Sequence, residues 1–139
     1  MLVTMQDIMK FLPHRPPVVM VDEIIDTEGS EITTSFTPDR HNIFCENGFF
    51  TEWGVIENMA QTAAVKAGYE AQMQGLEPQV GFIGAIKNFE IHQRVPVDNK
   101  IQTHLQITAE VMQIKLARVS VFLNQNLLAT CELKIFLQE

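Results

Sequence analysis

A chain of 139 residues, 46% of them hydrophobic, has the size of one domain and can bury most of its core. Its formal charge of −7 at pH 7 argues against nucleic acid as a partner, because such binding depends on many Lys and Arg contacts to phosphate. No stretch approaches the roughly 20 apolar residues of a membrane helix, and the N-terminal end has no signal-peptide pattern. We therefore expect one domain over residues 1–139, in the cytoplasm and away from membranes.

The spacing of cysteine, histidine and glycine residues predicts neither a metal site nor a nucleotide site. Cys45 and Cys131 form no CxxC pair, and the sequence contains no HExxH motif. It also lacks the GxxxxGKS/T and GxGxxG loops that hold phosphate groups. We therefore expect reduced thiols, no bound metal and no cofactor.

The N-terminal quarter of the chain predicts one short helix and a hairpin. The helix is expected over Met5–Leu12, with Thr4 as its N-cap, and Pro13 ends it because the residue before a proline avoids helical geometry. Two β-branched runs follow, Val18–Thr27 and Glu31–Thr37. The short polar turn between these runs indicates an antiparallel hairpin.

The longest periodic segment, Gly54–Met73, predicts a helix. Its apolar residues recur at i, i+3 and i+4 spacing and are mostly alanine in the middle turns, so a facing sheet could approach the helix closely. Gly75 and Pro78 should end this helix. The residues of the apolar stripe are Val55, Ile56, Met59, Ala60, Ala63, Ala64, Ala67 and Ala71.

Four more strands are expected after the helix. The clearest is Ile101–Val111, where apolar and polar residues alternate strictly, as in a strand with one buried and one exposed face. The others are Val80–His92, Ala117–Leu123 and Leu127–Leu137, and Asn124–Asn126 suits a tight turn between the last two. These elements predict an α+β fold in which an antiparallel sheet wraps around the long helix.

Glu57 is the strongest candidate functional residue. It lies in the first turn of the predicted helix, close to the apolar stripe. One interpretation is a carboxylate that the positive end of the helix dipole stabilises, by roughly 0.3–1 kcal/mol. The other is a half-buried acid/base group that transfers a proton or orients a substrate, with Gln61 one turn later able to hydrogen-bond it.

His41 is the histidine nearest in sequence to the start of this helix, which makes it the natural acid/base partner for Glu57. The alternative is a loop histidine in solvent. Asn42 beside it could orient a carbonyl group, whereas Cys45 is expected to be a small buried residue rather than a nucleophile. His14 lies in a proline-framed segment, and we expect a structural role for it.

Three separated stretches resemble the β-hydroxyacyl-acyl carrier protein dehydratases, which have the hotdog fold. Leu12–Asp26 (LPHRPPVVMVDEIID) is similar to that family's Leu-Pro-His-Arg-x-Pro motif and the strand after it. Ile56–Gln61 (IENMAQ) resembles the start of the family's central helix, which carries the catalytic acid. Ile83–Ile101 is similar to the strand, basic turn and strand that follow that helix.

This resemblance implies a homodimer or heterodimer with active sites at the subunit interface. It also implies removal of water from a β-hydroxyacyl thioester that acyl carrier protein holds on its phosphopantetheine arm. In that family a histidine removes the α-proton, the helix glutamate helps to expel the β-hydroxyl group, and a backbone N–H at the helix start polarises the thioester carbonyl. Carried over to this chain, Glu57 takes the glutamate's place and His41 is the candidate histidine. The expected substrate-binding residues are Gln61, Asn42, Gly54 and Trp53.

The segment before the helix departs from the family pattern. The family's Gly-His-Phe-Pro is replaced by His41-Asn42-Ile43-Phe44, and an ungapped alignment on Glu57 puts the family histidine at Ile43. This departure resembles a divergent branch found beside bacterial aryl-polyene and related polyketide or fatty-acid genes. Two alternatives to a dehydratase therefore stay open: an acyl thioesterase of the same fold, and a non-catalytic partner subunit of a dehydratase heterodimer.

Overall fold

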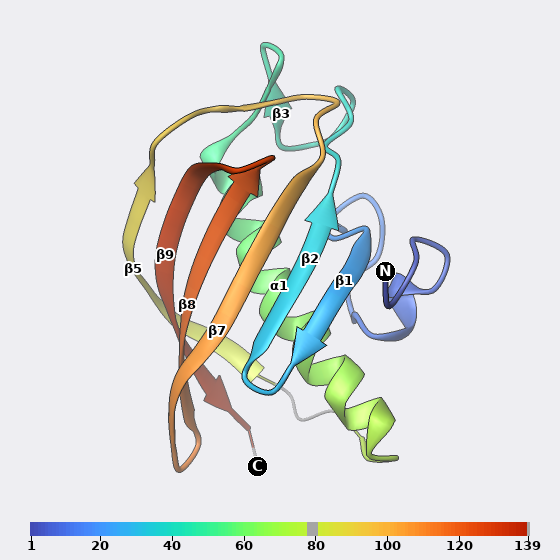
Figure 1. The fold of residues 1–139 in the computed structure, drawn as a ribbon, viewed down its shortest axis with the longest axis vertical. Helices are drawn as coiled ribbons and strands as arrows, with labels where there is room; N and C mark the ends of the chain where they lie inside the picture. Colours follow the sequence, from blue (N-terminus) through green and yellow to red (C-terminus); the bar gives the residue numbers. More distant parts are fainter. Residues whose placement is uncertain (78–80, 139) are drawn as a thin grey trace.

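A long helix, α1 (Glu52–Met73), lies along one face of a curved antiparallel sheet (Figure 1). The computed structural model describes residues 1–77 and 81–138. The six strands follow the order β1-β2-β7-β8-β9-β5, so the N-terminal hairpin forms one edge and β5 the other. The predicted α+β fold, with a sheet around a central helix, is confirmed. The strands of this sheet are β1 (Glu23–Glu28), β2 (Glu31–Phe36), β5 (Gly81–Ile91), β7 (Ile101–Val111), β8 (Ile114–Leu123) and β9 (Asn126–Leu137).

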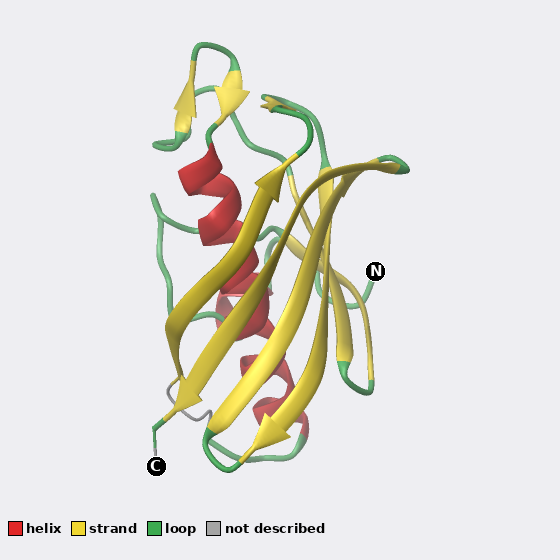
Figure 2. Cartoon of the chain, turned by 90° about the vertical axis from the view of Figure 1, so that its left-hand side faces the viewer, coloured by secondary structure: helices red, strands yellow, loops and turns green. Residues whose placement is uncertain are grey.

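A second, smaller sheet lies beyond the N-terminal end of α1 (Figure 2). Its three strands, in the order β3-β4-β6, are β3 (Cys45–Glu46), β4 (Phe49–Phe50) and β6 (Val95–Pro96). The sequence did not predict these strands, because two residues are too few to show a periodicity. The small sheet ties the segment before α1 to the segment after β5, and it therefore fixes where the helix begins.

Strand β7 has the bounds that the alternation predicted. Ile101, Thr103 and Leu105 are buried towards α1, whereas Gln102 and Gln106 between them are exposed on the opposite face. β7 pairs with β2 on one side and β8 on the other, which makes it a central strand. The strict alternation was informative because only one face of this sheet is covered by the helix.

At the N-terminal end the predicted antiparallel hairpin is confirmed as β1 and β2, but the predicted helix and the start of the first strand were wrong. Instead of a helix over Met5–Leu12, only Ile8–Lys10 forms a single 3₁₀ turn (η1), and its N-cap is Asp7 rather than the predicted Thr4, without a side-chain cap hydrogen bond. The segment is short for a stable helix, and the tighter turn still buries Ile8, Phe11 and Leu12, although Met5 and Met9 are exposed. The predicted strand from Val18 begins only at Glu23, because the backbone of Val18 and Met20 bonds to side chains of α1 instead of to a neighbouring strand.

The buried face of α1 also differs from the predicted stripe. Val55 and Met59 are buried as expected, but the rest of the face that meets the sheet includes the polar residues Asn58 and Thr62. These polar side chains can be buried because each has hydrogen-bond partners inside the protein. The predicted alanines Ala60, Ala63, Ala64, Ala67 and Ala71 are only half-buried, beside this face.

The C-terminal end of α1 agrees with the prediction. The helix ends at Met73, and Gly75 adopts a left-handed conformation with φ of 68°. The backbone N–H of Leu76 then bonds back to the carbonyl of Ala71 at 2.8 Å, as is typical of a glycine-terminated helix. Pro78, expected to help end the helix, and Val80, expected to begin the next strand, lie outside the described residues. Within the described ranges no helix, α1 included, has the length and apolar character to cross a membrane.

Gly68 of α1 lies against the backbone of Phe11 in the N-terminal segment, and it gives a test of this packing. A Cβ atom at Gly68 would lie 2.2 Å from the backbone oxygen of Phe11. We expect Gly68→Ala to lower the free energy of unfolding by about 1–3 kcal/mol, measured by urea denaturation, because the backbone must move to admit the methyl group.

Helix propensity alone predicts the opposite sign, a gain of about 1 kcal/mol. Ala67→Gly, at the preceding position, serves as the control and should cost about 1 kcal/mol through propensity. A higher urea midpoint for Gly68→Ala would contradict the close packing of Phe11 on the helix.

Candidate active site

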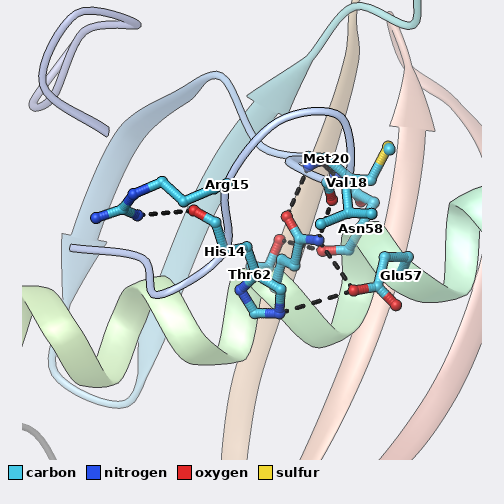
Figure 3. A network of polar contacts seen from close by, with 8 residues as sticks. His14, Arg15, Val18, Met20, Glu57, Asn58 and Thr62 are labelled. Carbon is cyan, nitrogen blue, oxygen red and sulfur yellow. Dashed lines mark hydrogen bonds and ion pairs between the residues drawn. The ribbon is translucent and has the colours of Figure 1, made fainter. Parts of the chain in front are cut away.

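Gln61 joins α1 to the segment that precedes β1. Its Oε1 accepts a hydrogen bond from the backbone N–H of Met20 at 2.6 Å, and its Nε2 donates to the carbonyl of Val18 at 2.6 Å. The side chain is completely buried. One amide thus satisfies two backbone groups that lack a strand partner, and it holds this segment against the helix (Figure 3).

Asn58 extends the same attachment into the sheet. Its Nδ2 donates to the carbonyl of Met20 at 2.7 Å, and its Oδ1 accepts from the Thr103 hydroxyl of β7 at 2.5 Å. One turn later, the Thr62 hydroxyl lies 2.9 Å from that of Thr34 on β2. These groups are buried, so the helix, the sheet and the N-terminal segment are joined by one satisfied polar network.

Glu57 lies at the solvent boundary of this network. Its Oε1 accepts a hydrogen bond from Gln61 Nε2 at 2.9 Å and lies 3.8 Å from Nε2 of His14. Its Oε2 makes no hydrogen bond to the described part of the chain and points away from both residues (Figure 3). The side chain is 35% exposed. One oxygen is therefore held, and the other can reach a bound molecule.

His14, for which a structural role was expected, lies beside Glu57, a contact that the sequence did not predict. Its imidazole is 31% exposed, but its Nδ1 is buried and has no hydrogen-bond partner among the described residues. Arg15 next to it is directed elsewhere and donates to the carbonyls of Leu12 and His14 at 2.7 Å. The signal in the sequence was the presence of both family motifs, since one carries His14 and the other Glu57.

His41 lies on an exposed loop before β3. Its backbone N–H donates to Asp39 Oδ1 at 2.7 Å, and no hydrogen bond or ion pair joins it to Glu57 within the described ranges. The neighbouring Asn42 accepts from the backbone N–H of Phe44 at 2.8 Å, and its Nδ2 lies 3.3 Å from the sulfur of Met20. The acid/base role of His41 and the substrate contact of Asn42 stay predictions.

The helix start contains the two other predicted substrate-binding residues. Gly54 is buried, and a Cβ there would lie 2.3 Å from the ring of Phe50, so this glycine permits the close packing of α1 on the small sheet. Trp53 is 72% exposed. Gln61, also predicted to bind substrate, uses its amide for contacts within the chain. Substrate binding by these three residues stays a prediction.

Both cysteines have thiols with a pKa above the ordinary value. Burial raises the pKa of Cys45, and the carboxylates of Asp39 and Asp98 raise it further. Burial, with a smaller effect of Glu132, raises the pKa of Cys131 to about 12. Among the described residues no group of three or more His, Cys, Asp or Glu side chains is arranged to hold a metal ion.

Removing Asn58 tests whether the polar network holds the fold together. We expect Asn58→Ala to lower the free energy of unfolding by about 2 kcal/mol, because it leaves the Met20 carbonyl and the Thr103 hydroxyl buried without partners. Urea denaturation measures the change. Gln102→Ala, which removes an exposed amide next to Thr103, is the control and should stay within about 0.5 kcal/mol. Equal small effects for both variants would show that the network adds little stability.

The reactivity of Cys45 tests its raised pKa. Because less thiolate is present at neutral pH, iodoacetamide should alkylate Cys45 more slowly in the folded protein than in urea, as followed by mass spectrometry between pH 7 and 9. Cys131 should react more slowly still, because it is buried and its pKa is about 12. Faster alkylation of Cys45 in the folded state would indicate an activated thiol instead.

Comparisons with known proteins agree with this fold. The family model described as ApeP-like, ApeP dehydratase, matches residues 6–139. The chain is 24% identical to the 3-hydroxyacyl-(acyl-carrier-protein) dehydratase FabZ of a Nitratiruptor species over 137 residues, which are 92% of this chain and 93% of that protein. It is 30% identical to the FabZ of Allorhizobium ampelinum over 105 residues, which are 71% of this chain and 66% of that protein.

Solved structures share the fold at low sequence identity. The dehydratase heterocomplex ApeI:P from Xenorhabdus doucetiae has a TM-score of 0.86 and 16% identity, with 95% of this chain and 91% of that chain covered. A hypothetical thioesterase protein from Streptococcus pneumoniae TIGR4, solved with coenzyme A, has a TM-score of 0.69 and 7% identity, with 84% and 87% covered. These similarities show the hotdog fold. Because the family model matches almost the whole sequence, the chain belongs to the ApeP-like dehydratase family.

Proposed function

We propose that this protein removes water from a 3-hydroxyacyl thioester carried on acyl carrier protein, with Glu57 as an acid/base group. The observation that carries the proposal is the Glu57 carboxylate, with Oε1 held by Gln61 and Oε2 free at a half-exposed position near the start of α1. Membership of a dehydratase family supports the type of reaction. We propose acyl carrier protein as the carrier of the substrate because the FabZ relatives, which are similar along most of this chain, are named for substrates on that protein.

The reaction fits a carboxyl group that has one anchored and one free oxygen. The C2–H bond breaks as a base takes the proton, its electron pair forms the C2=C3 double bond, and the C3–O bond breaks. The leaving oxygen takes a proton and departs as water. Under the proposal, Glu57 gives this proton from Oε2, and the base is a histidine, with His41 as this chain's candidate.

We further propose that the working unit contains two hotdog subunits, either two copies of this chain or one copy with a related subunit. Within the described residues β5 pairs only with β9, so the other edge of β5 is open. Two apolar side chains of this strand, Phe82 and Ile86, are 55% and 40% exposed. The similar ApeI:P structure is described as a dehydratase heterocomplex. A second subunit could bring a histidine to Glu57 from outside the chain, which fits the exposed position of His41. The cytoplasmic location stays a prediction of the sequence.

A thioesterase is the second candidate reaction. The free Oε2 of Glu57 could also activate water against the thioester carbonyl, and the similar protein from S. pneumoniae is described as a thioesterase. At 7% identity that similarity supports the fold only. The family match favours the dehydratase.

An assay of Glu57 variants tests the dehydratase proposal. The purified protein is given a 3-hydroxybutyryl thioester on acyl carrier protein, and the enoyl product and free thiol are measured by mass spectrometry. We expect enoyl product from the wild type and a loss of about 100-fold or more in kcat for Glu57→Gln, because the amide cannot transfer the proton. Glu52→Gln, at an exposed glutamate in the first turn of α1, before the turn that carries Glu57, is the control and should keep wild-type activity.

Each other outcome identifies an alternative. Free thiol without enoyl product would identify a thioesterase. If product forms only when a related hotdog subunit is added, and Glu57→Gln does not slow it, the chain is a non-catalytic partner. No enoyl product under either condition would overturn the dehydratase assignment.

A further inference from the structure

Two nitrogen atoms from different parts of the chain converge on the same oxygen of Glu57. Gln61 Nε2 on α1 bonds Oε1 at 2.9 Å, and His14 Nε2, from the segment before β1, lies 3.8 Å from it (Figure 3). The His14 contact is longer than a hydrogen bond. Contacts of this kind in active sites are often long before the substrate binds and shorten in the complex.

The surroundings of His14 decide which of its nitrogens carries the proton. Nδ1 is buried without a partner among the described residues in either neutral form, so the group that faces Nε2 decides. An N–H on Nε2 can donate to the Glu57 carboxylate, whereas a lone pair there would face the lone pairs of the carboxylate oxygen. The favoured neutral form therefore has its proton on Nε2, the nitrogen that faces Glu57. In this form His14 donates to the carboxylate through Nε2 and does not accept a proton there.

The position of His14 is fixed by the same contacts that hold its segment on the helix. Gln61 bonds the backbone of Val18 and Met20, a few residues after His14. The guanidinium of Arg15 bonds the carbonyls of Leu12 and His14, so this charge is not the partner of Glu57. The His14 imidazole is therefore the side chain of this segment that can donate a hydrogen bond to the Glu57 carboxylate.

We propose that His14 is a positioning residue for Glu57: its Nε2–H fixes Oε1 and leaves Oε2 as the oxygen that transfers the proton. This inference rests on the proposed dehydratase function. It assigns to His14 a role separate from that of the catalytic base, because the nitrogen that faces the site carries the hydrogen. Oε1 of the carboxylate then bonds to the protein, and Oε2 faces the substrate.

Three substitutions at His14 separate positioning from simple packing. The amide nitrogen of Gln can take the place of Nε2, whereas that of Asn corresponds to Nδ1, and Leu has no donor. In the dehydration assay we expect His14→Gln to stay within about fivefold of the wild-type kcat. His14→Asn and His14→Leu should lose about 10- to 100-fold in kcat with little change in KM, because a misplaced catalytic group slows the chemical step.

His104→Leu is the matched control. His104 also faces a glutamate, with its Nε2 3.1 Å from Glu31 Oε1, but this pair lies on β7 and β2 away from Glu57. The control should keep wild-type activity. Thermal unfolding of every variant shows whether it is folded. Equal losses for His14→Gln and His14→Leu, or no loss for His14→Leu, would overturn the positioning role while wild-type activity still supports the dehydratase.

The tautomer of His14 gives a readout that does not depend on activity. Long-range ¹H–¹⁵N correlation spectra of the wild-type protein, at a pH where the imidazole is neutral, should show the hydrogen on Nε2. Glu57→Gln should shift the His14 Nε2 resonance, because the group facing it changes. A hydrogen on Nδ1, or a His14 Nε2 resonance that does not shift in Glu57→Gln, would overturn the inference even if dehydration were never observed.

Discussion

The attachment of Val18–Met20 to helix α1 is the interaction on which the site depends. A strand would satisfy this stretch of backbone by pairing, but here the amides of Gln61 and Asn58 bond its peptide groups instead. A buried peptide group without a partner costs about 1–3 kcal/mol, so the two side chains and the segment require each other. Because Glu57 is on the same helix and His14 is on the same segment, this attachment brings them together.

The polar face of α1 therefore combines a structural and a chemical role. Asn58 and Thr62 reach β7 and β2 and fix the rotation of the helix against the sheet. With that rotation fixed, Glu57 lies at the edge of the buried face, where one carboxylate oxygen meets the amide of Gln61 and the other faces out. If α1 met the sheet through an entirely apolar face, that face would be buried, but no hydrogen bonds would fix the rotation of the helix.

The sequence was most informative where one periodicity covered many residues. The end of α1 before Gly75 and the bounds of β7 were predicted within a residue or two. The run from Val18 failed because apolar, β-branched residues look the same whether the backbone pairs with a strand or with helix side chains. The contact between His14 and Glu57 was not visible as a pattern at all, since it arises from tertiary structure between distant positions.

The geometry within one chain also limits what a second subunit has to supply. Glu57, Gln61 and His14 form one group of contacts inside the chain, whereas His41 is on an exposed loop outside it. If a base is brought across an interface, it has to approach the free Oε2 side, because Oε1 is already engaged. This requirement is the same for a second copy and for a related subunit. The fold of this chain thus positions Glu57, the proposed proton donor, and the choice of partner affects the supply of the base.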